Sequence, residues 1–194
     1  ASLLGGTTIV ISPLIALMHD QVQSLEEKGI AATFLTSTLS SEEARERMRN
    51  MANGEYKLVY VAPERLTFPG FRNLVQKIDC PLVAIDEAHC ISEWGHDFRP
   101  EYMRIGEFIQ DMPQAAILAC TATATPFVRD EILARLGLGS DTPQLIKGFA
   151  RPNLALRATD TSGKKDRHKH VDRLLRQALQ DPDSDAGTAI IYAP

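Results

Sequence analysis

The chain has 194 residues, of which 44% are hydrophobic, 24% charged and 6% aromatic. This composition is typical of a globular protein and excludes a disordered, collagenous or fibrous chain. The length allows one large domain, or one domain and part of a second. The formal net charge of -4 excludes a surface coated with nucleic-acid-binding positive charge, so any contact with nucleic acid has to be local.

The cysteines and the hydropathy indicate an intracellular protein without a membrane segment. Cys80, Cys90 and Cys120 lie far apart and form no Cys-x-x-Cys pair, so the sequence predicts neither a disulfide framework nor a closed zinc site. No apolar run in the sequence approaches the roughly 20 residues that a membrane helix needs. We therefore expect a reducing, intracellular compartment.

Short apolar runs predict strands at 7–11, 58–61, 82–85, 115–119 and 188–192. These runs are rich in Val, Ile, Leu and Ala and do not alternate with polar residues. That pattern is typical of strands covered on both faces of a parallel sheet. Helical patterns separate the runs, and this alternation predicts a doubly wound α/β fold.

Helices are predicted at 14–29, 40–51, 125–137 and 171–179. A capping box of Ser40 and Glu43 opens the second of them. Pro126 takes the tolerated first position of the third. Gly29 and Gly137 are placed to end the first and the third helix.

Glycines and prolines interrupt the helical periodicity between residues 139 and 163. We place a domain boundary near Lys147, so that residues 1–147 form a first domain. Residues 148–194 form the opening of a second, with a candidate strand at 154–158. The chain begins at Ala1 without methionine and ends at Pro194 directly after a predicted strand, which favours a fragment of a longer protein.

Two adjacent carboxylates, Asp86 and Glu87, follow the predicted strand 82–85. Ligands of a parallel α/β sheet bind at the carboxyl ends of its strands, so this is an expected place for chemistry. One carboxylate can hold Mg²⁺ through its water shell while its neighbour orients or deprotonates a water that attacks phosphorus. We expect Asp86 to take the first role and Glu87 the second. The alternative is that the pair only caps the next helix, the commoner role of an isolated Asp-Glu.

Residues 86–89, Asp-Glu-Ala-His, resemble the DEAH form of the Walker B motif of superfamily 2 helicases. Five further segments resemble RecQ-type DNA helicases: motif Ia at 10–22, motif Ib at 62–66, an aromatic-rich loop at 90–102, motif III at 121–125, and the entry to the second motor domain at 151–154. The resemblance implies a RecA-like first motor domain over 1–147 and the start of a second over 148–194.

The resemblance also implies cofactors, partners and a location. ATP and Mg²⁺ are the implied cofactors, and single-stranded and duplex DNA the implied partners. The location would be the bacterial cytoplasm, with the nucleoid, or a eukaryotic nucleus. His89 would join Asp86 and Glu87 in the catalytic segment.

The loop at 90–102, called the aromatic loop below, is the segment most specific to this family. The resemblance implies that it binds DNA and couples binding to hydrolysis through Ser92, Trp94, His96, Phe98 and Arg99. Aromatic faces beside a guanidinium can stack on unpaired bases without reading their sequence. The alternative is that Trp94 and Phe98 pack beneath the loop as a small core.

Further DNA contacts are implied for Ser12, Pro13, Thr36, Ser37 and Arg65. Hydroxyls and loop amides at these positions could hydrogen-bond to DNA phosphates. Residues as common as these more often only stabilise a turn or cap a helix. Thr121 and Thr123 are expected to hydrogen-bond the 86–89 segment and relay its state to the second domain. The alternative for these two threonines is simple capping of a strand end.

Two other clusters carry weaker signals. His89, Cys90 and His96 lie close in sequence but lack the spacing of a standard zinc site. The basic segment 164–176 could contact DNA, but such a segment is more often a solvated helix face.

The resemblance implies an ATP-dependent 3'-to-5' DNA helicase that couples Mg-ATP hydrolysis to translocation on single strands and duplex unwinding, in recombination and repair. The 194 residues contain no Gly-x-x-x-x-Gly-Lys-Ser/Thr loop, the Walker A motif, and no arginine finger, so we expect this chain alone to be inactive. Its net charge of -4 predicts that this chain alone binds DNA weakly. One alternative is a superfamily 2 RNA-remodelling ATPase, which the aromatic loop disfavours. Another is a non-catalytic nucleic-acid-binding module without an ATP site.

Overall fold

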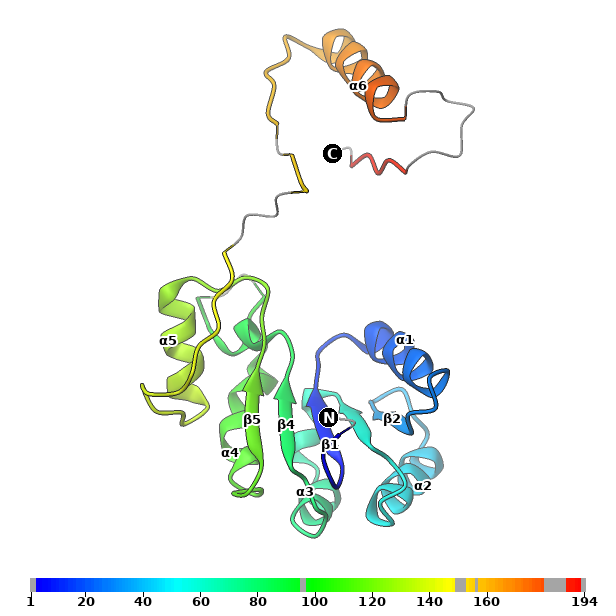
Figure 1. The fold of residues 1–194 in the computed structure, drawn as a ribbon, viewed down its shortest axis with the longest axis vertical. Coiled ribbons are helices and arrows are strands. Elements are labelled where there is room, and N and C mark those ends of the chain that lie inside the picture. The colour runs from blue at the N-terminus through cyan, green and yellow to red at the C-terminus, as the bar shows by residue number, and fades with distance from the viewer. Residues whose placement is uncertain (1–2, 95–96, 149–152, 156, 180–187, 193–194) are drawn as a thin grey trace. The chain divides into compact units, whose positions relative to one another are not determined.

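The structure is a computed structural model that describes residues 3–94, 97–148, 153–155, 157–179 and 188–192. The chain divides into two compact units, residues 1–144 and 145–194. The first unit contains a five-stranded sheet (Figure 1). In sheet order the strands are β2 (Ala32–Leu35), β3 (Leu58–Val61), β1 (Thr8–Ile11), β4 (Leu82–Ile85) and β5 (Ala116–Ala119).

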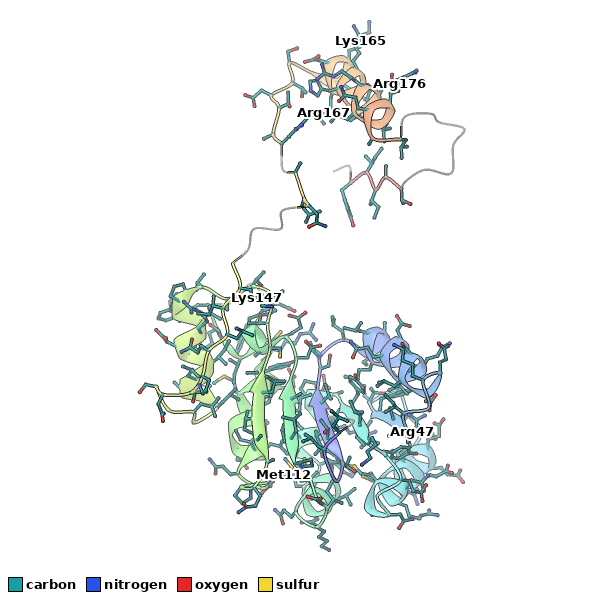
Figure 2. The ribbon with its side chains drawn as sticks, viewed as in Figure 1. Arg47, Met112, Lys147, Lys165, Arg167 and Arg176 are labelled. Carbon is teal, nitrogen blue, oxygen red and sulfur yellow. The ribbon has the colours of Figure 1, made fainter. Side chains whose placement is uncertain are left out.

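Four of these strands confirm the sequence prediction, while β2 is not among the predicted strands. β3 and β4 have the predicted bounds, and β1 and β5 each begin one residue later. β2 is an edge strand that pairs with β3 alone. Arg47, labelled in Figure 2, donates to the Phe34 carbonyl of β2 at 2.9 Å, and its guanidinium lies 4.3 Å from the centre of the Phe34 ring. Contacts with residues outside the strand therefore hold β2 in the sheet.

The first three predicted helices are present. α1 (Ile15–Glu26) is followed by Gly29 in the left-handed region, at a φ of 73°. α2 (Ser41–Ala52) opens with both hydrogen bonds of the predicted capping box between Ser40 and Glu43. α5 (Pro126–Arg135) begins directly after its N-cap residue Thr125, whose hydroxyl accepts a hydrogen bond of 3.3 Å from the backbone N–H of Val128.

Five shorter elements were outside the prediction. They are the helices α3 (Pro69–Val75) and α4 (Ile105–Ile109) and the 3-10 helices η1 (Pro63–Thr67), η2 (Ala88–Ile91) and η3 (Pro100–Arg104). Each has seven residues or fewer, which is too short for an apolar period to stand out. Several of them connect the strand ends to the helices, so they shape the edge of the sheet.

The apolar core lies on both faces of the sheet. Residues 59 and 61 of β3 belong to one cluster, together with Phe71 of α3 and Phe108 of α4. Residues 58 and 60 belong to the other, together with Met18 of α1. Because alternate residues of a strand point to opposite faces, helices cover both faces. This is the predicted doubly wound arrangement.

All five strands are parallel, so their carboxyl ends share one edge of the sheet. Directly after the strands come Ser12, Thr36, Ala62, Asp86 and Cys120. The fold thereby gathers segments that are more than 100 residues apart in the sequence, from Ser12 to Cys120. Five predicted functional segments begin at this edge: 12–13, 36–37, 62–66, 86–89 and 121–125.

In the second unit, the predicted helix is present as α6 (Lys164–Leu179), which ends as predicted but begins seven residues before the predicted 171–179. None of its residues is buried, and the side chains of Lys165, Arg167 and Arg176 extend from it (Figure 2). The basic segment 164–176 is thus an exposed helix. No helix in the described part of the chain is long and apolar enough to cross a membrane.

The two strands predicted in the second unit are wrong. Residues 188–192 form no strand, and Ile190 and Tyr192 are 75% and 91% exposed. The described residues of 154–158 are not a strand either. An apolar run becomes a strand only when a neighbouring strand pairs with it, and the described residues of this unit supply none.

Candidate active site

The Asp86 carboxylate is fixed at the carboxyl end of β4. Its Oδ2 accepts a hydrogen bond of 3.1 Å from the Ser12 hydroxyl, and its Oδ1 accepts one of 3.0 Å from the backbone N–H of Glu87. The Asp86 backbone N–H donates to the Ile11 carbonyl of β1 at 2.8 Å. The carboxylate is half-buried, so it is oriented by the sheet while keeping access to solvent.

Glu87 adopts a backbone conformation that is unusual for its residue type. Its φ of 47° and ψ of 44° lie in the left-handed region, and it is the one non-glycine with positive φ among the described residues. Such a conformation costs a residue with a side chain about 1–2 kcal/mol. Strained residues of this kind gather at functional sites, which marks this turn as a candidate.

Tyr102 supports the strained turn through a hydrogen bond, and the sequence did not indicate this role. Its side chain is fully buried, and its hydroxyl donates to the Asp86 carbonyl at 2.9 Å. Burial raises the pKa of Tyr102, so the hydroxyl stays protonated and keeps donating at neutral pH. The signal in the sequence was a tyrosine at the closing end of the aromatic loop.

His89 connects Glu87 to the segment after β5. Its Nδ1 lies 2.8 Å from the Thr121 hydroxyl and 3.2 Å from Oε2 of Glu87. Thr121 therefore makes the contact with residues 86–89 that the sequence predicts. Thr123 instead donates its backbone N–H to the Thr121 hydroxyl at 3.3 Å, so it supports Thr121.

The donor atoms at this edge suit a magnesium ion. The Asp86 and Glu87 carboxylates offer hard oxygen atoms, the ligands that Mg²⁺ prefers. His89, Cys90 and Asp97 also place possible ligand atoms within 4.8 Å of one another. Burial raises the pKa of the Cys90 thiol to about 11, which favours the protonated thiol at neutral pH in the metal-free protein. His96, the third residue of the sequence cluster, lies outside the described residues.

Trp94 lies on the surface of the aromatic loop, with 78% of its area exposed. The alternative of a small core beneath the loop is therefore wrong for Trp94, while Phe98 is half-buried. The Trp94 ring meets Phe127 of α5 edge to face, with ring centres 6.2 Å apart. Phe127 is itself 59% exposed, and sequence reasoning missed it. An aromatic residue in the first turn after motif III was the available signal.

Arg99 and Arg65 hold neighbouring loops together. The Arg99 guanidinium donates to the Pro13 carbonyl at 3.2 Å, which joins the aromatic loop to the segment after β1. The Arg65 guanidinium donates to the Thr36 carbonyl at 2.8 Å and lies 5.8 Å from the centre of the Phe68 ring. Both arginines are half-buried, so each can fix a loop and still present part of its charge.

Three of the hydroxyls predicted to contact DNA require a correction. Ser12, Thr36 and Ser92 are 2%, 0% and 0% exposed, and their hydroxyls bond to Asp86, Thr38 and Glu131. A buried and bonded hydroxyl cannot reach a DNA phosphate, so these side chains position their neighbours. Ser37 is exposed and Pro13 is half-buried, which leaves both accessible.

Comparison with known proteins adds the family. Residues 2–131 match the DEAD/DEAH box helicase family. The chain is 46% identical over 188 residues to the ATP-dependent DNA helicase RecQ of Bacillus subtilis strain 168, which covers 96% of this chain and 30% of the relative. It is 40% identical over 174 residues to the RecQ of Haemophilus influenzae, covering 90% of this chain and 27% of the relative. The chain thus spans less than a third of the length of these relatives.

A solved structure of the Hef helicase domain of Pyrococcus furiosus is also similar, with 20% identity and a TM-score of 0.47, over 70% of this chain and 28% of that one. The family match covers more than half of the chain and includes the parallel sheet and the 86–89 segment. The sheet with helices on both faces is the RecA-like fold of helicase motors. The chain therefore belongs to the DEAD/DEAH box helicase family, and within it to the RecQ group.

Proposed function

We propose that the complete gene product is an ATP-dependent DNA helicase of the RecQ type. It hydrolyses ATP with Mg²⁺, moves 3' to 5' along single-stranded DNA and unwinds duplexes in recombination and repair. Such a protein acts in the bacterial cytoplasm or in a eukaryotic nucleus. The observation that carries the proposal is the oriented Asp86 carboxylate beside the strained Glu87, in a chain whose relatives are named ATP-dependent DNA helicases.

The two carboxylates divide the chemistry of hydrolysis between them. Asp86, held by Ser12, would hold Mg²⁺ through bound water, and the ion supplies positive charge to the phosphates. Glu87 orients the water that attacks the terminal phosphorus and accepts its proton. His89 lies between Glu87 and Thr121, so it ties the position of the Glu87 carboxylate to the segment after β5.

The aromatic loop supports the DNA side of the proposal. Trp94 offers an exposed ring for stacking on an unpaired base, which contributes about 1–3 kcal/mol per base. Phe98, Arg99 and Arg65 would line the path of the strand, with Ser37 and Pro13 at the neighbouring strand ends. The loop follows residues 86–89 directly, so a strand bound there can change the site of hydrolysis.

Unwinding assays test this function in the complete gene product. Three substrates are compared with ATP and Mg²⁺: a DNA duplex with a 3' single-stranded tail, the same duplex with a 5' tail, and an RNA duplex with a 3' tail. We expect unwinding of the 3'-tailed DNA, because the protein loads on the single strand and moves toward the junction. Equal unwinding of the RNA duplex would contradict the proposal and favour an RNA-remodelling ATPase.

A further inference from the structure

The base of the aromatic loop is fastened to helix α5 by a buried hydrogen bond. The Ser92 hydroxyl donates to Oε2 of Glu131 at a distance of 2.6 Å. Ser92 is fully buried, and the Glu131 side chain is 15% exposed. A hydrogen bond to a carboxylate is stronger than one between neutral groups, and it strengthens further where water is excluded. Glu131 is thus a fixed anchor point for the loop.

The same hydroxyl also controls the backbone at Trp94. Ser92 Oγ accepts a hydrogen bond of 3.2 Å from the Trp94 backbone N–H while it donates to Glu131. Hydrogen bonds therefore run without a break from Glu131 of the helix through the Ser92 hydroxyl to the backbone of Trp94, whose ring is exposed. A hydroxyl whose proton is committed to a carboxylate is a better acceptor for the second bond.

Two more contacts join the loop to the same helix. The Trp94 ring meets Phe127 of α5 edge to face, and a carboxylate oxygen of Glu93 lies 3.9 Å from the Arg135 guanidinium. Arg135 also pairs with Glu131 at 3.4 Å. Glu131 is the least exposed of the three α5 side chains that make these contacts.

Helix α5 is also joined to the hydrolysis segment. It begins directly after Thr125, the last residue of motif III, and Thr121 of the same motif contacts His89. Helix α5 is therefore a continuous connection between the aromatic loop and motif III. The geometry gives Glu131 a place between the DNA-stacking ring and the catalytic segment.

We propose that Glu131 is a positioning residue for DNA binding, which sets the orientation of Trp94 through Ser92. The inference rests on the proposed function, because it gives the Trp94 ring the task of stacking on single-stranded DNA. Glu131 acts through Ser92 and does not itself touch DNA or nucleotide.

The experiment compares Glu131→Ala, Glu131→Gln, Trp94→Ala and the double variant Glu131→Ala with Trp94→Ala. Asp130→Asn is the matched control, since it removes one negative charge from an exposed neighbour on the same helix. Affinity for a fluorescein-labelled oligo(dT) strand is measured in the complete gene product. Mobility of the indole is measured as tryptophan fluorescence anisotropy in the 194-residue chain, where Trp94 is the single tryptophan. Thermal unfolding is recorded for every variant.

We expect Glu131→Ala to weaken strand binding by about tenfold, the scale of losing one charge-assisted hydrogen bond. Its Trp94 anisotropy falls, because the ring loses its backbone anchor. Glu131→Gln weakens strand binding less than Glu131→Ala does, since its amide oxygen still accepts the hydrogen bond from Ser92. The double variant binds as weakly as Trp94→Ala alone, because Glu131 acts only through that ring. Asp130→Asn behaves as wild type in both assays.

Four results would overturn the inference, and they are distinguishable. If Trp94→Ala binds the strand as tightly as wild type, the loop's role in the proposed function fails, and this inference fails with it. If Trp94→Ala weakens binding but Glu131→Ala does not, or if the two losses multiply in the double variant, the proposed function stands and the positioning role is refuted. If Glu131→Ala lowers the melting temperature with unchanged anisotropy, Glu131 has a structural role only.

Discussion

Glu87 shows at the scale of one residue how the proposed function and the stability of this protein conflict. The other described positions with positive φ are occupied by glycine, at 6, 29, 54, 137 and 163. A glycine at position 87 would relieve the backbone but would remove the carboxylate. The chain therefore accepts a strained residue at the end of β4, where a neighbouring bond from Tyr102 supports the turn.

This strain predicts an inverted order of stability between two substitutions. Glu87→Gly and Glu87→Ala both remove the carboxylate, but glycine adopts the left-handed region without a steric cost. We expect the glycine variant to have a free energy of unfolding about 1 kcal/mol higher than the alanine variant. Urea denaturation of the two variants measures the difference.

Glu46 supplies the control pair for that comparison. It is exposed within α2, where glycine is about 1 kcal/mol less favourable than alanine. Glu46→Gly should therefore be less stable than Glu46→Ala, the opposite order. If alanine is the more stable substituent at position 87 as well, the strain argument is wrong.

Residue types at the sheet edge were predictable, but their burial was not. The sequence places hydroxyls after the strands and suggests that Ser12, Thr36 and Ser92 face a DNA strand. The structure turns their hydroxyls inward. The partners of two of them lie far along the chain, since Ser12 bonds to Asp86 and Ser92 bonds to Glu131. A local pattern contains no information about such pairings, whereas the Asp86 and Glu87 pair follows its own strand directly.

At the scale of elements, predictions succeeded where the local signal was complete. β3 and β4 have the predicted bounds because their apolar runs are continuous, and the capping box fixed the start of α2. β2 was missed because Thr33 interrupts its apolar run, and the strand is held by its pairing with β3 and by Arg47. Residues 188–192 have the pattern of a strand, but the described residues of the second unit contain no strand that could pair with them.

The packing of α4 against α5 makes a second stability prediction. A Cβ atom added to Gly106 in α4 would overlap the carbonyl oxygen of Arg135 at the end of α5. Two backbones would have to separate, so we expect Gly106→Ala to lower the free energy of unfolding by about 1–3 kcal/mol. The melting temperature and the urea midpoint of the variant provide the measurement.

Gly70 is the matched control, because it also lies in a short helix, α3. A Cβ atom there would meet only the ring of Phe68, at 3.4 Å, which is ordinary contact. Alanine has the higher helix propensity, so Gly70→Ala should be neutral or more stable by up to about 1 kcal/mol. Equal losses at the two positions would refute the close approach of α4 and α5.

At the scale of the whole molecule, the parallel sheet explains how one edge collects the site. Residues after β1, β4 and β5 contact one another there, and the aromatic loop leaves from the same edge. A net charge of -4 is compatible with DNA binding when the contacts are confined to this edge. This net charge predicts that the proposed affinity for DNA depends on the aromatic loop and not on the rest of the protein surface.

The most direct test of the account is ATP hydrolysis by the complete gene product and by its Glu87→Gln variant, each with and without single-stranded DNA and Mg²⁺. Glutamine keeps the shape of Glu87 but cannot accept the proton of the attacking water. We expect wild-type hydrolysis to require both Mg²⁺ and DNA, and the DNA-stimulated rate of Glu87→Gln to fall by about 10²–10⁴-fold. Glu46→Gln, an exposed change in α2, should keep the wild-type rate. DNA-stimulated hydrolysis that survives in Glu87→Gln would contradict the central claim.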